Sequence, residues 1–258
     1  MINLVKQQRL KRKRRWFILR LSLYCILVGF AFFSIAKFAS GVFFTSDNGH
    51  AVPETVPTSK GYIVLDPGHG GEESPGCEYG GILERDVTLE MSLLIRDELV
   101  MRGYTVMMTR EQDEHVTLAQ RTEMANNSGA DLLLSIHLNA FEDFSVSGIE
   151  TWFNPNTNPR SSTLAEYVQQ SFVASVKGKD RGTYSDTSLF LTREVLIPSC
   201  LVEVGYLSNA EEREKMTTAA YREKIAQGIA DGIEQYFQKF PSSQSQAHAI
   251  TKVGRYYK

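Results

Sequence analysis

Four short segments of the chain place a histidine or a glutamate at the end of a strand-like apolar run. They span residues 62–71, 81–86, 135–140 and 201–209. Their polar members are His69, Glu84, His137 and Glu203. Because polar groups at strand ends can converge on one cleft, the fold has to bring these distant segments together. Two neutral imidazoles and one carboxylate can hold a zinc ion and leave a fourth position for water, while a second carboxylate supplies a base.

Strand-like and helical patterns alternate along residues 61–240. Short β-branched or aliphatic runs predict buried strands at 62–66, 105–109, 132–136, 148–153 and 200–204. Apolar residues at helical spacing predict helices at 87–99, 118–127, 164–176 and 221–237. This alternation is typical of the α/β class. We expect a single three-layer domain with a mostly parallel, twisted sheet flanked by helices.

The first 44 residues differ in composition from the rest of the chain. Seven Lys and Arg residues lie within residues 1–15, and the apolar stretch 16–44 that follows is interrupted only by Arg20 and Lys37. A membrane helix needs roughly 20 apolar residues, and the two basic side chains can extend to the interfaces, so we expect one transmembrane signal-anchor over 16–44. The basic segment 1–15 predicts a cytoplasmic N-terminus, and therefore a single-pass protein of the cell membrane with an extracytoplasmic catalytic domain.

A cleaved signal peptide is the alternative reading of this stretch, and it would produce a secreted protein. Ala39 and Gly41 are small residues that would permit cleavage. Residues 45–60 are polar with two prolines and are expected to form a linker. The catalytic domain is then expected over 61–240, followed by a flexible polar tail at 241–258.

Charge also separates the two parts of the chain. Nine of the 28 Lys and Arg residues and none of the 30 Asp and Glu residues lie within 1–44, so the remainder carries 19 basic against 30 acidic side chains, a net charge of −11. An acidic outer domain is a poor candidate for binding phosphates, and we expect no nucleic-acid partner. Cys25 lies in the apolar stretch and Cys200 in a buried-looking strand, so a disulfide between Cys200 and Cys77 is not expected.

Each of the four polar residues also has a structural explanation. His69 could be a simple loop residue in its glycine-rich turn, and Glu84 could favour the start of the helix that follows it. His137 could be a buried, hydrogen-bonded structural histidine. Glu203 is harder to explain in this way, because a carboxylate inside an apolar strand end is costly to desolvate. Such burial raises a carboxyl pKa, as a general base working at neutral pH requires.

Taken in order, these segments resemble the zinc-dependent N-acetylmuramoyl-L-alanine amidases of bacterial cell-wall hydrolysis, the Amidase_3 type. The matching pieces are Asp66-Pro-Gly-His69-Gly-Gly, Glu84-Arg-Asp86, Thr109-Arg110, Leu118-Ala-Gln-Arg121, Ala125-Asn126, Ala130-Asp131, Ser135-Ile-His137-Leu-Asn139-Ala, Gly148-Ile-Glu150, Arg181-Gly182, Pro198 and Val202-Glu203-Val-Gly-Tyr-Leu-Ser-Asn209. The resemblance covers about residues 61–239. It departs from the family at Tyr206, where phenylalanine is common.

The resemblance implies both a site and a reaction. His69, Glu84 and His137 would bind Zn²⁺, and Glu203 would be the catalytic residue. A zinc ion activates water and polarises the amide carbonyl between the lactyl group of N-acetylmuramic acid and L-alanine. Glu203 would accept the water proton and pass it to the leaving amine, which releases stem peptides from peptidoglycan.

Four further residues have less certain assignments. Asn139 could orient His137 or contact the substrate, and Glu150 could support the metal ligands from behind. Both also have structural explanations. Arg110 and Arg121 could grip a peptide carboxylate, or they could form structural ion pairs.

Other functions remain open at this point. A zinc carboxypeptidase-like peptidase would use a His-x-x-Glu pair, which here gives His69 and Glu72, and a catalytically silent wall-binding regulator would need no intact site. The thiolate of Cys77 could in principle compete for zinc, although the family pattern needs no cysteine there. The chain is similar to amidases of the spore cortex, but roles in division or wall turnover fit equally. The sequence has no separate wall-binding repeat, so recruitment could depend on a partner protein.

Overall fold

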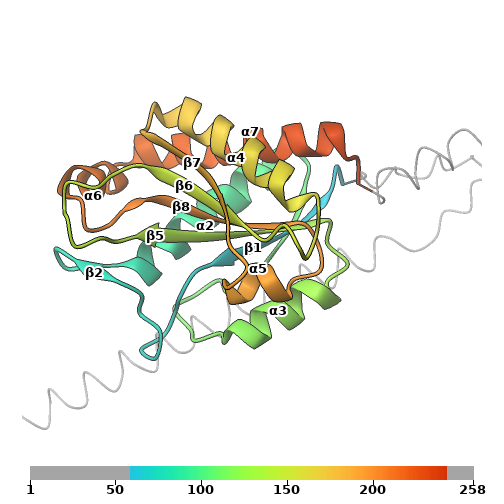
Figure 1. Cartoon of the computed structure of the whole chain (residues 1–258), viewed down its shortest axis with the longest axis horizontal. Helices are drawn as coiled ribbons and strands as arrows, with labels where there is room; N and C mark the ends of the chain where they lie inside the picture. Colours follow the sequence, from blue (N-terminus) through green and yellow to red (C-terminus); the bar gives the residue numbers. More distant parts are fainter. Residues whose placement is uncertain (1–58, 243–258) are drawn as a thin grey trace, which may run out of the picture. The chain divides into compact units, whose positions relative to one another are not determined.

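A computed structural model gives the structure of the chain for residues 59–242, which fold around one six-stranded sheet (Figure 1). In order across the sheet, the strands are β4 (Thr105–Met108), β1 (Tyr62–Pro67), β5 (Leu132–Asn139), β8 (Ser199–Tyr206), β6 (Ile149–Phe153) and β7 (Asp180–Ser185). The four strands from β4 to β8 are parallel. β6 is antiparallel to β8, and β7 is parallel to β6. The expected mostly parallel sheet is therefore confirmed.

Helices cover both faces of this sheet. The helices α2 (Glu84–Met101), α4 (Ser161–Val176) and α7 (Ala219–Lys239) lie on one face, and α3 (Leu118–Asn127) and the short α5 (Phe190–Glu194) lie on the other (Figure 1). A small hairpin of β2 (Glu78–Tyr79) and β3 (Ile82–Leu83) precedes α2, and α6 (Ala210–Met216) follows β8. The helices and the sheet form the three layers expected from the sequence.

The two faces of the sheet are packed to different extents. Because strand side chains alternate between faces, Ile136 and Val202 belong to the large core with α2, α4 and α7. Leu133 points the other way and joins a smaller core with Ala125 of α3 and Leu191 of α5. Further along the same face, the β5 positions Ser135, His137 and Asn139 are polar and lie outside both cores. This part of the sheet is the floor of the functional site.

The predicted strands and helices are all present, and several ends differ. β5 extends beyond the expected segment to Asn139, so His137 is a strand residue, and β8 extends to Tyr206 beyond the expected end at residue 204. The β2–β3 hairpin, β7, α5 and α6 were not expected from the sequence. Each is short or polar, and β7 in particular has no alternation of apolar and polar residues because its sequence is Asp-Arg-Gly-Thr-Tyr-Ser.

Several expectations concern parts of the chain outside the described residues. They are the cytoplasmic segment 1–15, the transmembrane segment 16–44, the linker up to residue 58 and the tail from residue 243. Within 59–242, no helix has the length and apolar character needed to span a membrane. Cys77 and Cys200 both have free thiols.

Candidate active site

His69 lies in a tight loop directly after β1. Its φ of 62° is in the left-handed region, which is uncommon for a residue with a side chain and is characteristic of functional sites when the surroundings fix it. The imidazole Nδ1 lies 3.3 Å from the hydroxyl oxygen of Ser74. Nε2 lies 3.2 Å from Oε1 of Glu84. The loop therefore directs Nε2 towards the other residues of the site.

Two buried arginines hold this loop through its backbone carbonyl groups. Arg110 donates to the Gly68 carbonyl at 2.9 Å, and Arg121 donates to the His69 carbonyl at 2.5 Å. Arg121 also forms a buried ion pair with Asp66 at 2.6 Å. Burial opposes ionisation of Asp66, but the Arg121 charge holds the pKa of this carboxyl below its usual value. Of the two interpretations of these arginines, the structural one agrees with their burial and backbone hydrogen bonds.

Glu84 is the first residue of α2 and is only 4% exposed. Its Oε1 accepts a hydrogen bond from the backbone N–H of Leu138 at 3.0 Å, and its Oε2 accepts one from that of Cys77 at 3.0 Å. Burial opposes the charged form, but His137 and His69 hold the pKa of Glu84 well below its usual range. The carboxylate is thus ionised and fixed in position. It does more than favour the start of the helix.

His137 lies on β5, and its Nδ1 is 3.2 Å from Oε1 of Glu84. Its ring packs against Gly68, where an added Cβ atom would lie 2.4 Å from Cε1 of the imidazole. Only glycine leaves room for the ring at this point. The rings of His69 and His137 meet edge to face, with centroids 4.9 Å apart.

His69, Glu84 and His137 form a group that could hold a metal ion, with ligand atoms within 4.8 Å of one another. The distance from Glu84 Oε1 to each histidine nitrogen is 3.2 Å. Two ligands of a tetrahedral zinc ion with bonds of about 2.0–2.1 Å lie about 3.3–3.4 Å apart. Two imidazoles and a carboxylate are also a donor set that zinc hydrolases use. The residues present therefore fit zinc.

Glu203 lies on β8 directly opposite His137 of β5. Its Oε2 atom is buried and has no hydrogen-bond partner among the described residues. Burial, together with the charges of Glu84 and Glu150, raises the pKa of Glu203 well above its usual range. A buried polar atom without a partner is costly and rare in folded proteins, so it points to a functional role.

Glu150 of β6 lies opposite Glu203 and is fully hydrogen bonded. Its four donors are the Tyr206 hydroxyl at 2.5 Å, the Arg181 guanidinium, the Asn139 amide at 3.3 Å and the Trp152 indole at 3.2 Å. Within residues 59–242, Asn139 makes its side-chain hydrogen bonds to Glu150 and Ala140 rather than to His137. The structure thus links Asn139 and Glu150 in one network beside Glu203.

Cys77 lies close to the same centre. Its thiol lies 3.9 Å from the Leu138 carbonyl. Burial and the neighbouring Glu84 carboxylate raise the pKa of Cys77 to about 12, which opposes formation of a thiolate ligand.

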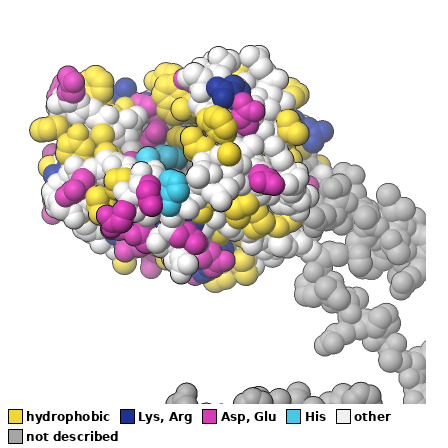
Figure 2. All heavy atoms as spheres, turned by 90° about the horizontal axis from the view of Figure 1, so that it is seen from below, with side chains coloured by type: hydrophobic (Ala, Val, Ile, Leu, Met, Phe, Trp, Pro, Cys, Tyr) yellow, Lys and Arg dark blue, Asp and Glu magenta, His cyan; other side chains and the backbone are white. Residues whose placement is uncertain are grey.

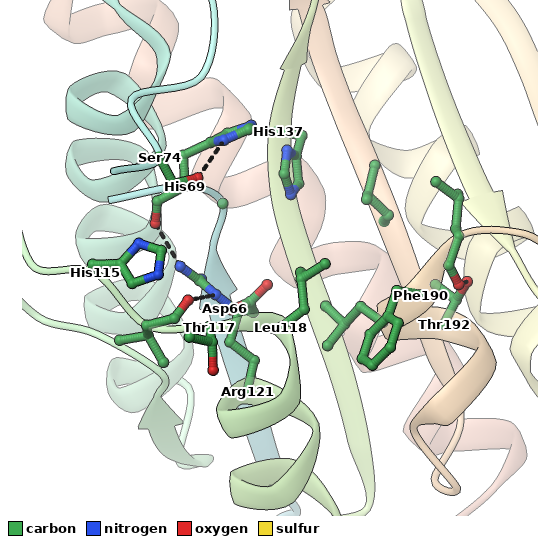
Figure 3. A pocket seen from close by; sticks show the side chains of 15 residues that line it. Asp66, His69, Ser74, His115, Thr117, Leu118, Arg121, His137, Phe190 and Thr192 are labelled. Carbon is green, nitrogen blue, oxygen red and sulfur yellow. Dashed lines mark hydrogen bonds and ion pairs between the residues drawn. The ribbon is translucent and has the colours of Figure 1, made fainter. Parts of the chain in front are cut away.

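A cavity of about 300 Å³ includes two of the three candidate ligands, His69 and His137, in its wall (Figure 3). Leu118 at the start of α3 and Phe190 of α5 form other parts of this wall. Figure 3 shows His137 between the loop of His69 on one side and Phe190 on the other. On the surface, histidine side chains are visible in a hollow in the middle of this face (Figure 2). The candidate metal centre is therefore accessible from outside.

Known proteins are similar to this chain over the part of it that carries the site. The family model for N-acetylmuramoyl-L-alanine amidase matches residues 63–235. The chain belongs to this family. It is an N-acetylmuramoyl-L-alanine amidase, a hydrolase of the cell wall.

Among the relatives of this amidase, the germination-specific N-acetylmuramoyl-L-alanine amidase of Bacillus subtilis is 34% identical over 206 residues, which cover 74% of this chain and 86% of the relative. The sporulation-specific amidase of the same organism is 31% identical over 190 residues, which cover 73% of this chain and 72% of that relative. The structure also resembles the CwlD amidase of Clostridioides difficile in complex with the GerS lipoprotein. That match has a TM-score of 0.66 and 32% identity, and covers 69% of this chain and 98% of that one.

Some residues of the amidase site are not evident from the sequence. Ser74, His115 and Phe190 all line the cavity, but none lies in a strand-end motif. For Ser74 the one available signal is its position five residues after His69 in the same loop. His115 lies in the loop before α3 and Phe190 begins α5, and only the folded sheet brings these two segments together.

Proposed function

We propose that this amidase depends on zinc and hydrolyses the bond between N-acetylmuramic acid and L-alanine in peptidoglycan. In this proposal His69, Glu84 and His137 are the metal ligands and Glu203 is the general base. The observation that carries the proposal is the buried Oε2 atom of Glu203, which lies on the strand beside His137 and has no partner in the part of the chain that the structure describes. When bound, zinc would supply an activated water and polarise the substrate carbonyl.

The protein's own residues perform the proton transfers. Glu203 accepts the proton of the attacking water and then donates it to the nitrogen of the leaving L-alanine. Because Oε2 has no existing hydrogen bond among the described residues, it can receive this proton without breaking one. The raised pKa of Glu203 makes the carboxylate more basic and favours the protonated form needed in the second step.

Two alternative functions lose support at particular residues. A carboxypeptidase-like site would need Glu72 as a partner of His69, but the side chain of Glu72 is 94% exposed and its ion-pair partner, at 3.6 Å, is Arg85. A silent wall-binding regulator has no need for an intact metal group together with a buried glutamate oxygen that has no partner within residues 59–242. All of these features are present here.

Mass spectrometry of muropeptides tests the proposed reaction. Purified peptidoglycan is incubated with the full chain in detergent, with and without a chelator, and in parallel with a Glu203→Gln variant. We expect stem peptides with a free L-alanine N-terminus, loss of these products with chelator and recovery on adding zinc. Glu203→Gln should lose about 10²–10⁴-fold in rate while keeping its metal. Shortened stem peptides still attached to the glycan would instead identify a carboxypeptidase.

We also propose that residues 16–44 anchor the enzyme in the cell membrane as a single-pass helix, with the catalytic domain outside the cytoplasm. Support comes from the basic segment 1–15 and the long apolar stretch that follows it. Fractionation of the tagged full chain would then place it in the membrane at full length. A shortened, soluble product beginning near residue 42 would identify a cleaved signal peptide instead.

We propose that the cellular process is spore formation or germination and that a protein partner recruits the enzyme. This follows from the names of the two Bacillus subtilis relatives and from the lipoprotein complex of the Clostridioides difficile relative. Deletion of the gene should then leave vegetative growth unchanged and produce spores with altered cortex muropeptides. A division defect in growing cells would argue for another role.

A further inference from the structure

Trp152 of β6 and Tyr184 of β7 form a stacked aromatic pair, which we call the aromatic wall. Their ring centroids lie 4.8 Å apart and their planes are inclined by 25°. Trp152 is partly buried, and Tyr184 is 37% exposed. Neither residue belongs to the metal group or lines the cavity beside it.

The aromatic wall lies on the same face of the sheet as the candidate active site. Trp152 is paired with Leu201 of β8 on one side and with Tyr184 on the other. Directly paired residues have side chains on the same face, so the wall continues the surface from Leu201, which lines the cavity. Glu150, two residues before Trp152, is paired with Glu203 in the neighbouring row. The wall therefore lies one row away from the proposed general base.

The spacing between the wall and the metal group can be estimated from the sheet. Neighbouring strands lie about 4.8 Å apart, so β6 lies about 10 Å from β5, where His137 is located. This separation is comparable with one sugar ring and its lactyl arm. A substrate with its amide at the metal group could thus place the attached sugar near Trp152.

Hydrogen bonds fix the orientation of both aromatic rings. The Trp152 indole N–H donates to Glu150 Oε2 at 3.2 Å, and the Tyr184 hydroxyl donates to the Arg181 carbonyl at 2.8 Å. Arg181 in turn is paired with Glu150. A ring held in this way loses little conformational freedom when a ligand binds, so the surface is preorganised.

We propose that the aromatic wall is a carbohydrate subsite that binds the glycan strand of peptidoglycan next to the scissile amide. The CH-rich face of a pyranose ring is attracted to the electron-rich face of an aromatic ring, and apolar area is removed from water at the same time. A glycan strand is a long polymer that has to leave the cleft at an open edge. β7 is the edge strand of the sheet, whereas the cavity of about 300 Å³ is bounded by α3 and α5 and suits a short peptide. This inference rests on the proposed substrate.

Tryptophan fluorescence tests the subsite directly. The chain has two tryptophans, Trp16 and Trp152, so Trp16→Phe in the full chain leaves Trp152 as the sole reporter. The protein in detergent is titrated with a peptide-free oligosaccharide of alternating N-acetylglucosamine and N-acetylmuramic acid, and separately with a free stem peptide. We expect a saturable change with the oligosaccharide and none with the peptide. Phe190→Ala, in the cavity wall, should leave the oligosaccharide response unchanged.

Kinetics provide a second, independent test. Trp152→Ala should raise KM for muramoyl peptides about tenfold, whereas Trp152→Phe should keep KM close to that of the parent. Neither variant should change KM for an N-lactoyl peptide, which has the same amide but no sugar. Equal losses on both substrates, or a fluorescence response to the stem peptide alone, would overturn the subsite. Because glycan binding is measured without hydrolysis, an inactive chain that still binds the oligosaccharide would contradict only the proposed function. An active chain without that response would contradict only the subsite.

Discussion

Glu203 and Glu150 lie directly opposite each other on β8 and β6, and their hydrogen bonding is unequal. Glu150 accepts hydrogen bonds from four side chains, one of which is the cationic Arg181. Glu203 Oε2 is buried with no donor in the described part of the chain. The charge of Glu150 contributes, after burial and the charge of Glu84, to the raised pKa of Glu203. The fold thus places a fixed carboxylate beside the one that has to exchange a proton.

This relationship predicts that Glu203→Gln stabilises the metal-free protein at neutral pH. A carboxyl with a raised pKa binds its proton more tightly in the folded state, so its contribution to stability is greatest at low pH and is lost as the pH rises from about 4.5 towards the raised folded value. A glutamine side chain does not titrate, so the Gln variant does not lose stability as the pH rises through this range. We expect a higher free energy of unfolding for Glu203→Gln at pH 7 in the presence of chelator, and a much smaller difference below pH 4. A variant less stable than the parent at pH 7 would contradict the burial of an uncompensated carboxylate.

Arg181→Met should move the acidic limb of the pH–activity profile to higher pH. Removing the cation beside Glu150 leaves more negative potential around Glu203, which favours the protonated form of this residue and raises its pKa further. We expect the acidic limb of the profile of kcat/KM against pH to move by up to about one pH unit. Arg181→Lys keeps the charge and is the matched control. A limb that stays in place or moves to lower pH in the methionine variant would argue against electrostatic coupling between these carboxylates.

His69→Ala and His137→Ala should each remove tightly bound zinc. Either change leaves two protein ligands, whereas a hydrolytic zinc site normally has three. His115→Ala is the control, because His115 lines the same cavity and lies outside the group of three. Metal analysis after dialysis should give a full complement of zinc in the control only. Full occupancy in both ligand variants would rule out the assignment.

Arg121→Met should destabilise the whole domain. It would leave the Asp66 carboxylate buried without its cation and would release the carbonyl of His69. Breaking a buried ion pair at one partner costs about 3–5 kcal/mol. Adding Asp66→Asn should recover part of this loss, because no buried charge then remains unpaired. Arg96→Ala, which breaks a more exposed pair with Glu111, should cost no more than about 1 kcal/mol in urea unfolding.

The sequence predicts five of the six strands of the sheet and the two strand-end histidines, because these depend on local patterns. The apolar runs before His69 and around His137 indicate parallel strands, and ligands at the carboxyl ends of such strands lie close together. Glu203 is recognisable for a related reason, since an acidic residue within an apolar strand needs an explanation.

The network beside Glu203 cannot be predicted in the same way. Glu150 receives donors from β5, β6, β7 and β8, so its environment depends on the register of four strands. β7 itself is polar and is stabilised by pairing with β6 rather than by any pattern of its own. The stacking of Trp152 on Tyr184 follows from that pairing and has no separate signal in the sequence.

Gly68→Ala should weaken metal binding through a purely steric effect on His137. The added Cβ atom would lie 2.4 Å from Cε1 of the imidazole, so the ring would have to move and its Nδ1 would leave the position 3.2 Å from Glu84. Residues that hold a metal ligand in place typically contribute about 10–100-fold to metal affinity, and we expect a loss of that order in competition with a chelator. Gly129→Ala is a matched control, because Gly129 has a φ of 73° but the new Cβ would have no atom of residues 59–242 within 4 Å. It should cost about 1–2 kcal/mol of stability through backbone strain and leave zinc affinity unchanged. If Gly68→Ala bound zinc as tightly as the parent, the packing of this glycine against His137 would not be what positions the ligand.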